Sequence, residues 1–204
     1  WNGWEKCLQI FSETNKKTHI NVLDVACGNG RFYKFLTDNL HTSVNYLGID
    51  NNDFMMLEGL LKYKLAEFKN LDILNELDLI ENTYDLLTVF GLTHHIPGHE
   101  FRINWFKQLP RLLNNNGILI ITFWNLSEDD RFNKAKKAAD LEENDYYYGW
   151  GNSKDKRYVH IYADDEINTI KTEYEKQNLK LISEFYSDGK TGNLNRYLMF
   201  KLCP

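Results

Sequence analysis

Small and acidic residues gather near the start of the chain in a pattern that could bind a ligand. Asp24 lies in the apolar run Val22–Val25, and Gly28 and Gly30 follow it. Glycine lets the backbone turn sharply and lets a ligand approach the backbone closely. A helix that we expect from Arg31 would point its N-terminal amides into the same space. The stretch therefore predicts a ligand cradle at the carboxyl end of a strand.

A second acid supports this interpretation. Asp50 and Asn51 end the apolar run 46–49, and an acid about 20 residues after such glycines holds the hydroxyls of an adenosine ribose. A dinucleotide is disfavoured, because the third glycine of its motif is replaced by Tyr33. The alternative role for Asp50 is a helix N-cap, for which Asn51 and Asn52 also compete.

A histidine pair follows the next strong apolar run, 84–91. His94 and His95 could supply a base or a metal ligand. Adjacent side chains diverge, and the pair makes no zinc pattern with His99, so we predict no metal site. The alternative is that one histidine is buried and hydrogen-bonded while the other caps the next helix.

Hydrophobic periodicity predicts alternating strands and helices around these residues. We expect strands at 20–24, 44–49, 66–71, 84–91, 118–124, 179–187 and 194–202, and helices at 1–15, 31–40, 53–63, 99–113 and 164–177. We expect Met55, Met56, Leu60 and Leu61 to pack in the core. Gly117 is expected to supply a positive φ after the fourth helix, and Asp164 or Asp165 to cap the fifth.

The composition limits the partners and the compartment. A chain of 204 residues can form one domain with a sizeable core, and its net charge of −5 gives no overall attraction to nucleic acid. Three scattered cysteines favour a reducing cytoplasm, and no run is long enough to cross a membrane. We expect no signal peptide before the first strand. Because the chain begins at Trp1 rather than at methionine, we expect residues upstream.

The segment at about 125–160 is too long for an ordinary loop. Three lysines lie within 134–137, aromatic residues are dense in 145–151, and Lys154, Lys156 and Arg157 follow. Cations interleaved with aromatic rings suit a nucleotide, whose phosphates and bases they bind. The alternative is a solvated helix with a small hydrophobic cap over the sheet.

The glycine stretch resembles the first motif of class I S-adenosylmethionine (SAM) methyltransferases, with Ala26 where that family usually has glycine. The resemblance implies an α/β, Rossmann-like fold with a seven-stranded, mostly parallel sheet that ends in an antiparallel hairpin. It implies one domain over 1–204 with a cap insertion at about 125–160. The implied SAM-binding residues are Asp24, Ala26, Gly28, Gly30, Asp50, Asn51, Asp72, Ile73, Val89 and Phe90. For Asp72 a solvated loop position is the alternative.

Nearly the whole chain resembles bacterial and archaeal relatives of the eukaryotic wobble-uridine tRNA carboxymethyl methyltransferases. The motifs are 23–30, 93–96 with Arg102, 122–125, 145–150 and 157–160, where Val159 replaces the family's second tyrosine. The family also usually has a short N-terminal arm ahead of Trp1. The resemblance implies a carboxylate acceptor on tRNA, and its eukaryotic members use a small zinc-binding activator subunit.

A carboxylate acceptor needs an anchor but no base, because a carboxyl group with a pKa of about 4 is already ionised. We expect Arg157 and His160 to be that anchor, Arg102 to lie behind them, and Asp145 to fix Arg157 or a ribose. An amine or phenol acceptor would instead need a base, and then His94 or His95 is the first candidate. A small-metabolite methyltransferase and a non-catalytic subunit of the same fold are the alternative functions.

Overall fold

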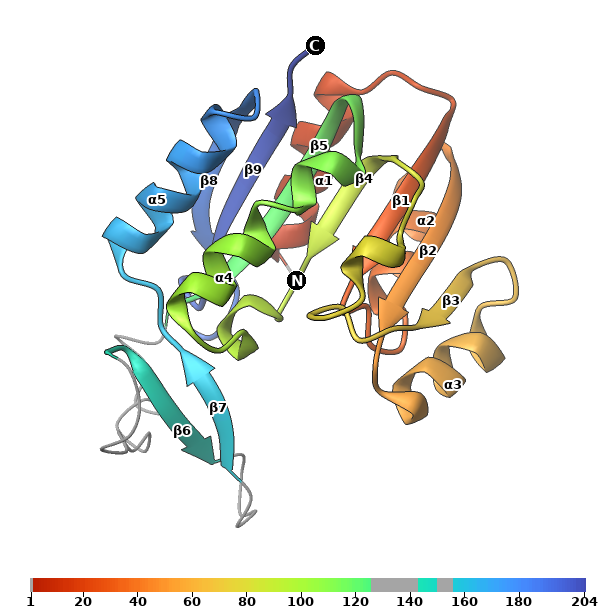
Figure 1. The fold of residues 1–204 in the computed structure, drawn as a ribbon. Coiled ribbons are helices and arrows are strands. Elements are labelled where there is room, and N and C mark those ends of the chain that lie inside the picture. Colours follow the sequence, from red (N-terminus) through yellow and green to blue (C-terminus); the bar gives the residue numbers. More distant parts are fainter. Residues whose placement is uncertain (1, 126–142, 150–155) are drawn as a thin grey trace.

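The computed structural model describes residues 2–125, 143–149 and 156–204. A seven-stranded sheet with strand order β3-β2-β1-β4-β5-β9-β8 forms its centre (Figure 1). Its strands are β1 (His19–Val25), β2 (Ser43–Asp50), β3 (Glu67–Asn70), β4 (Tyr84–Val89), β5 (Leu113–Trp124), β8 (Leu179–Ser187) and β9 (Asn195–Leu202). β1 to β5 run parallel, whereas β9 is antiparallel to both β5 and β8. The predicted fold class is confirmed.

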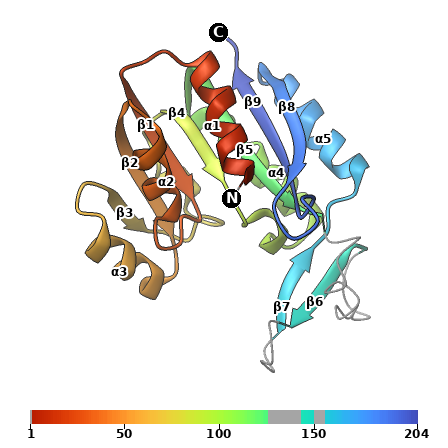
Figure 2. The same ribbon diagram turned by 180° about the vertical axis from the view of Figure 1, so that it is seen from behind.

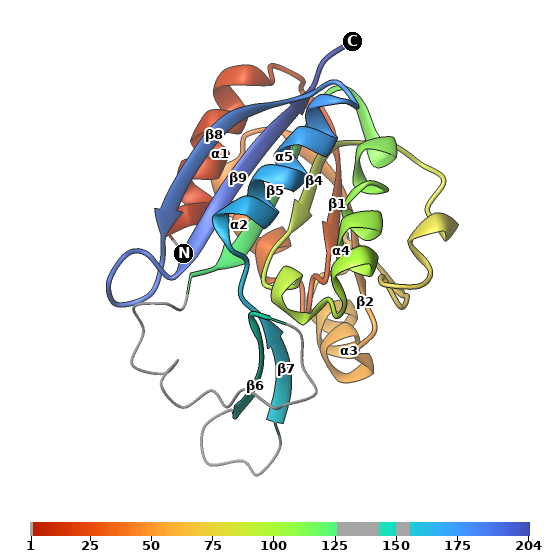
Figure 3. The ribbon, with the colours of Figure 1, turned by 60° about the vertical axis from the view of Figure 1, so that its left-hand side comes forward.

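Helices lie on both faces of this sheet. They are α1 (Asn2–Thr14), α2 (Arg31–Asn39), α3 (Asp53–Lys62), α4 (His99–Phe106) and α5 (Asp164–Glu175), with short 3₁₀ turns η1 (Leu77–Leu79), η2 (Thr93–His95) and η3 (Leu109–Leu112). The views from behind and from the side show α1 and α2 on one face and α4 and α5 on the other (Figures 2 and 3). Each face has its own apolar core, because central strands such as β4 are buried on both sides.

The register of the central strands brings their carboxyl ends to one edge. Asp24 pairs with Gly48 of β2 and with Thr88 of β4, and Val25 pairs with Ile49 and Val89. The turns after β1, β2 and β4 therefore meet at this edge. A ligand-binding crevice in an open α/β sheet forms at such an edge.

A separate two-stranded sheet lies beyond the same edge. β6 (Asp145–Gly149) pairs antiparallel with β7 (Lys156–His160), and this hairpin projects from the main sheet near η2 and the start of α5 (Figure 1). Part of the predicted nucleotide-binding segment is thus a β-hairpin. The lysines at 134–137, Trp150 and Lys154 lie outside the described residues.

Some local expectations were wrong. The positive φ after the fourth helix belongs to Asn116 (65°), and the stretch from Leu113 is already strand. Gly117 is required for a different reason, because backbone atoms of Asn114 and Tyr84 crowd the space beside it. The fourth helix ends at Phe106, and a 3₁₀ turn containing Pro110 follows it. The N-cap of α5 is Ala163, whose N–H donates to Glu166 instead.

The expectation for α3 was wrong in part. Met56 is buried, but Leu60 is 45% and Leu61 is 64% exposed. The helix contacts the rest of the protein through one narrow side, where Gly59 lies against the ring of Phe68. Apolar character alone could not distinguish the packed side from the exposed one.

Candidate functional site

The turn after β1 has the backbone conformation that the glycine pattern predicts. Ala26, Gly28 and Gly30 all have positive φ values, of 61°, 55° and 77°. A Cβ on Gly30 would lie 2.6 Å from the ring of Phe68, whereas one on Gly28 would meet only the flexible end of Met55, at 3.0 Å. Gly30 is thus required for packing. The space beside Gly28 is filled only by the flexible side chain of Met55, which can move aside.

Asp50 is aimed at this turn from the end of β2. Its Oδ2 accepts a hydrogen bond from the Gly28 N–H at 2.8 Å, and its Oδ1 accepts one from the Asn52 N–H at 2.9 Å. The N-cap of α3 is Asn52, which accepts from the Met55 N–H. Asp50 is therefore not the cap, and its carboxylate lies beside the turn that follows β1. Asn51 is exposed beside it.

Asp24 lies in a different environment from Asp50. It is 2% exposed and accepts hydrogen bonds from the hydroxyls of Tyr46 (2.6 Å) and Thr88 (2.7 Å), so it links β1 to both of its neighbours. Burial raises the pKa of Asp24 to about 6, although both hydroxyls oppose the shift. In this arrangement Asp24 holds the strands together at the base of the turn.

The remaining cofactor candidates surround the same edge. Asp72 accepts bonds from the Leu74 N–H and the Asn75 side chain, and the Ile73 carbonyl accepts the Trp105 indole N–H at 2.8 Å. Val89 ends β4 and Phe90 follows it, packed against Trp4 and Phe32.

Gly91 comes next and shows where this edge is open. It has a φ of 67°, and a Cβ added to it would have no neighbouring atom within 4 Å among the described residues. The open backbone at Gly91 and the movable side chain of Met55 beside Gly28, with Asp50 at the end of β2, fit a nucleoside ligand such as the adenosyl group of SAM.

One indole and two histidines lie together next to this edge. The imidazole of His94 lies on the indole of Trp124, with ring centroids 3.6 Å apart and an angle of 14° between the planes, and His95 lies 4.1 Å away on η2. His94 is 1% exposed, and neither ring nitrogen has a hydrogen-bond partner among the residues that the structure describes. Burial, together with the charges of His95 and Arg157, lowers the pKa of His94 well below its usual value.

His95 is held differently from its neighbour. Its Nδ1 donates to the carbonyl oxygen of Tyr158 at 2.9 Å, which joins η2 to β7. Burial and Arg157 lower the pKa of His95, while the Tyr158 carbonyl opposes this. Both histidines are therefore weak bases that are neutral at physiological pH.

Arg157 lies on β7, the hairpin strand that His95 contacts. It is exposed on β7, on the opposite face from Tyr158 and on the same face as Val159, which packs with Trp124. Its charge acts on both histidines. Lys156 is the neighbouring exposed cation, and Tyr146 and Tyr147 on β6 are partly exposed.

The other three acceptor-side candidates are brought together, but they are buried. Arg102, Asp145 and His160 are at most 3% exposed. His160 bonds Asp145, and Arg102 Nη1 lies 3.7 Å from Asp145. Two residues that sequence reasoning missed complete the group, Tyr158 and Glu166. The only sequence signal for Glu166 was its place in the first turn of α5.

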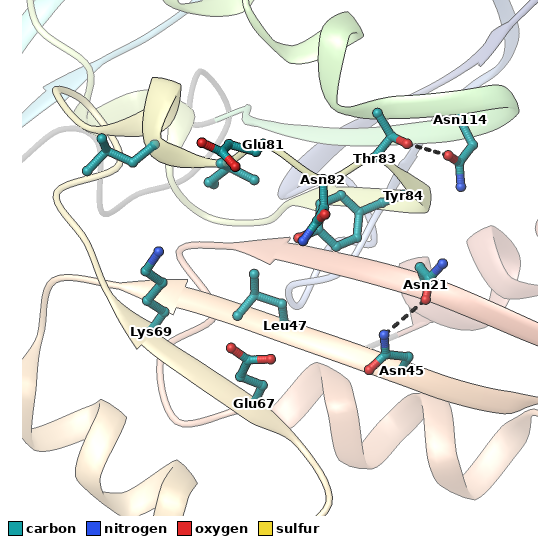
Figure 4. Close-up of a pocket in the computed structure, with 12 residues that line it drawn as sticks. Asn21, Asn45, Leu47, Glu67, Lys69, Glu81, Asn82, Thr83, Tyr84 and Asn114 are labelled. Carbon is teal, nitrogen blue, oxygen red and sulfur yellow. Dashed lines mark hydrogen bonds between the residues drawn. The ribbon is translucent and has the colours of Figure 1, made fainter.

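A polar cavity of about 610 Å³ lies away from this edge (Figure 4). It opens over the amino-terminal halves of β1 and β2, where the connection from β3 to β4 contains only η1 instead of a covering α-helix. Asn45 donates to Asn21 within it, and Thr83 donates to Asn114. Because none of the predicted site residues lines it, we do not include it in the candidate site.

The described residues hold neither a metal cluster nor a membrane-spanning helix. Among residues 2–125, 143–149 and 156–204, no three His, Cys, Asp or Glu side chains are grouped as a metal site would require. None of the described helices is both long enough and apolar enough to cross a membrane.

Residues 23–119 match the family model described as a methyltransferase domain. A protein of Encephalitozoon cuniculi named as a methyltransferase is 30% identical over 144 residues, 70% of this chain and 63% of that protein. tRNA methyltransferase 9B of Mus musculus is 27% identical over 63% of this chain and 27% of its own length. Demethylmenaquinone methyltransferase of Listeria welshimeri is 26% identical over 57% of this chain and 49% of that protein. The chain thus spans less than two thirds of these relatives.

Solved structures share the fold at low identity. A SAM-dependent methyltransferase from Clostridium acetobutylicum superposes with a TM-score of 0.74 at 16% identity, over 97% of this chain and 89% of that chain. The N-methyltransferase NodS of Bradyrhizobium japonicum, in complex with S-adenosyl-L-homocysteine, gives 0.66 at 12% identity, over 98% and 86%. These likenesses concern the fold alone.

Proposed function

From the premise that the chain carries a class I SAM-dependent methyltransferase domain, with SAM as its methyl donor, we propose that it methylates a carboxylate oxygen of a modified uridine in tRNA. When bound, SAM supplies a methyl group on a positively charged sulfur to an aligned nucleophile. The protein's own part is to bind both molecules, to align them and to exclude water. The observation that carries the choice of acceptor is the burial of His94, whose ring nitrogens have no hydrogen-bond partner among the described residues.

On the donor side, the residues that would hold SAM lie around the glycine turn. Asp50 would receive the ribose hydroxyls, and the open backbone at Gly91, together with movement of Met55 away from Gly28, would admit the ligand. The remaining contacts that the resemblance implies, from Asp72 and Ile73 to the adenine and from Val89 and Phe90 to the methionine part, belong to the same edge. Asp24 would act by holding β1 between β2 and β4.

On the acceptor side, the two histidines favour a group that is already ionised. A general base works best when its pKa lies near the working pH, and the pKa of His94 lies well below 6.5. Burial and the charge of Arg157 lower the pKa of His95 as well, although the Tyr158 carbonyl opposes this shift. An amine or phenol acceptor would need a better base, whereas a carboxylate with a pKa of about 4 needs none.

Arg157 and His94 are the residues that we assign to the acceptor. The guanidinium would neutralise the carboxylate, and a neutral imidazole N–H would donate to it. Contact with the acceptor would also give His94 the hydrogen bond that it lacks among the described residues. Among the other candidates, Arg102, Asp145 and His160 are paired with one another behind the hairpin.

The hairpin supports a nucleotide as the molecule that bears this carboxylate. Lys156 and Arg157 are exposed on β7, and Tyr146 and Tyr147 are partly exposed on β6. Cations bind phosphates and rings stack on bases. The similarity to tRNA methyltransferase 9B agrees with this choice, while the similarity to demethylmenaquinone methyltransferase keeps a small-molecule acceptor as the alternative.

The test is methyl transfer from isotopically labelled SAM to two pools. Bulk tRNA is digested to nucleosides and a metabolite extract is separated in parallel, and the label is located by mass spectrometry. A labelled, base-labile methyl ester on a uridine supports the proposal. Label only in the metabolite pool supports the alternative, and SAM binding without transfer to either pool indicates a non-catalytic subunit or a missing partner.

We extend the proposal to a partner, a small activator protein of the kind that the resemblance implies. Three apolar side chains on α3 are strongly exposed, with Phe54 at 88%, Leu61 at 64% and Leu57 at 55%, and Leu65 beyond the helix is 89% exposed. Contiguous apolar surface of this kind marks interaction sites. Co-purification of the chain with candidate activators, followed by the same transfer assay, tests whether activity depends on the pair.

A further inference from the structure

A compact group of polar side chains lies behind the acceptor side of the hairpin. Arg102 comes from α4, Asp145 from β6, Tyr158 and His160 from β7, and Glu166 from α5. The Tyr158 hydroxyl donates to Asp145 Oδ1 at 2.7 Å, and Arg102 Nη1 donates to the same hydroxyl at 3.0 Å. Arg102 Nη2 lies 3.5 Å from Glu166 Oε1. Four separate elements of the fold therefore meet in one cluster.

His160 is at the centre of this cluster, with a carboxylate at each end of its ring. Nδ1 lies 2.5 Å from Asp145 Oδ1, and Nε2 lies 3.0 Å from Glu166 Oε2. A neutral imidazole has one N–H and one lone pair, so it can donate to only one carboxylate. The arrangement satisfies both acceptors only if His160 is an imidazolium with a proton on each nitrogen.

The two carboxylates behave as acceptors in the rest of their contacts. Asp145 Oδ1 also accepts the Tyr158 hydroxyl, and Glu166 Oε2 accepts the Ala163 N–H at 3.2 Å. Burial by itself would raise the pKa of Glu166, but His160, the Ala163 amide and Arg102 together lower it to about 2. Glu166 is therefore ionised at neutral pH.

The charges in the cluster balance. Arg102 and His160 supply two positive charges, and Asp145 and Glu166 supply two negative ones. Among the described residues, the other titratable groups that face His160 or Glu166 are two phenols and a histidine. The phenols are Tyr158 and Tyr162, whose ring lies 4.6 Å from that of His160, and the Nδ1 of His99 lies 3.5 Å from Glu166 Oε1. Buried charges are tolerated when they are paired and hydrogen-bonded in this way, and removal of one partner leaves another uncompensated.

The cluster is connected to the proposed acceptor residues through the backbone. Tyr158, held by its side chain, presents the carbonyl oxygen that accepts from His95, and Arg102 Nη1 also donates to the Ile96 carbonyl at 3.3 Å. These bonds fix β7 and η2 against each other. Arg157 is adjacent to Tyr158, and His94 is adjacent to His95, so both acceptor residues belong to the two segments that the cluster joins.

We propose that Glu166, acting through a doubly protonated His160, is a positioning residue that docks the β6–β7 hairpin and so sets the places of Arg157 and His94. Glu166 does not touch the acceptor in this scheme. The inference rests on the proposed function for what is positioned, but the protonation of His160 and the docking of the hairpin can be measured without any acceptor.

The first experiment uses the unmodified protein. Long-range ¹H–¹⁵N spectra at neutral pH distinguish an imidazolium from either neutral tautomer. We expect His160 to show the imidazolium pattern. A neutral His160 at pH 7 would overturn the proposal, and no substitution that could unfold the chain is involved.

The second experiment compares Glu166→Gln with Glu173→Gln. Glu173 lies on the same helix but pairs with Lys107 and Lys176 at the surface, so it is a matched control for the loss of one carboxylate from α5. In Glu166→Gln we expect faster hydrogen exchange of the β6–β7 amides, unchanged exchange in β1 and β4, and unchanged SAM affinity. The control should match the unmodified protein. Equal exchange in the two variants would overturn the proposal.

Kinetics then connect the cluster to the acceptor. Small displacements of positioning groups cost up to about 100-fold in rate, so we expect kcat/KM for the acceptor to fall about 10- to 100-fold in Glu166→Gln, mainly through KM. The Glu173→Gln control should keep its activity. Activity equal to the control, despite a loosened hairpin, would overturn the positioning role. The unmodified protein could fail to methylate tRNA while the NMR spectra and the hydrogen exchange match our expectations. The proposed function would then be contradicted, but the docking of the hairpin by Glu166 and His160 would not.

Discussion

His94 stacks on Trp124 with 3.6 Å between ring centroids, yet both of its ring nitrogens are buried without a hydrogen-bond partner in the described part of the chain. A phenylalanine could occupy the same stack. A buried unsatisfied polar group costs about 1–3 kcal/mol, so a polar side chain kept in an apolar position suggests a ligand that completes its bonds.

We therefore predict that His94→Phe stabilises the protein and impairs its reaction. The free energy of unfolding should rise by about 1 kcal/mol, because two unsatisfied nitrogens are removed while the stack remains. The acceptor kcat/KM should fall about tenfold or more, with SAM affinity unchanged, because a hydrogen bond to an ionised group contributes about 1.5–3 kcal/mol.

Urea unfolding and steady-state kinetics check both parts of this prediction. His95→Phe is the control, since it breaks the bond to the Tyr158 carbonyl and should destabilise the protein by about 1 kcal/mol. Loss of stability in His94→Phe would mean that the imidazole has a structural role.

Asp50→Asn should weaken SAM binding with little effect on the fold. The carboxylate holds the Gly28 N–H at 2.8 Å and would receive ribose hydroxyls with its remaining lone pairs. Hydrogen bonds to a charged group contribute about 1.5–3 kcal/mol, which corresponds to roughly 10- to 100-fold in affinity. Calorimetric titration with SAM and with S-adenosylhomocysteine measures this. Asp53→Asn, three residues later and exposed, loses the same charge and should bind as the unmodified protein does.

Ala26→Gly should stabilise the protein. Ala26 has a φ of 61°, and an L-residue in the left-handed region costs about 1–2 kcal/mol. The extra freedom of glycine in the unfolded chain offsets roughly 0.4–1 kcal/mol of this, so a net gain of about 0.5–1 kcal/mol is expected in urea unfolding. Ala66 is a control outside the positive-φ residues, and Ala66→Gly should not stabilise. A loss of stability in Ala26→Gly would show that the alanine methyl contributes packing that outweighs the strain.

The fold could be predicted from apolar runs, because a buried parallel strand is a mostly apolar run of residues in the sequence, as 84–89 is. The site could be predicted only in part. Asp50 and the glycine turn are close in sequence to the elements that place them, so their roles could be anticipated. Arg102, Asp145 and His160 were each expected on the acceptor side, with Asp145 fixing Arg157 or a ribose. Their pairing with one another was not expected, because it depends on contacts with Glu166 and Tyr158 across the fold. Pairing over such distances leaves no periodic signal in the chain.

Asp24 should make stability fall as pH rises from about 4 to about 6. Its pKa is 3.8 in an ordinary setting and about 6 in the folded protein, where burial disfavours the charged form. Between these values the folded state binds the extra proton, so its stabilising effect is fully present below pH 4 and is lost as pH passes through 6. At 1.36 kcal/mol per pKa unit the loss is on the order of 3 kcal/mol.

Asp24→Asn, measured by urea unfolding across pH 3 to 8, isolates this contribution from other titrating groups. As pH rises from about 4 to about 6, the free energy of unfolding of Asp24→Asn should increase relative to that of the unmodified protein, because the amide does not ionise. A difference that is independent of pH would contradict the raised pKa of Asp24.

Arg157→Gln should raise the pKa of both His94 and His95, because the charge of Arg157 lowers each of them in the folded protein. Ring NMR titrations measure these shifts without any acceptor. Lys156→Gln is the matched control, since Lys156 is exposed on the neighbouring position of β7 and its side chain points to the other face of the strand. Lys156→Gln should leave both titrations nearly unchanged. If instead neither variant moves them, Arg157 does not face the histidines. If only Arg157→Gln moves them and also raises the acceptor KM, the same guanidinium both keeps His94 neutral and attracts the carboxylate.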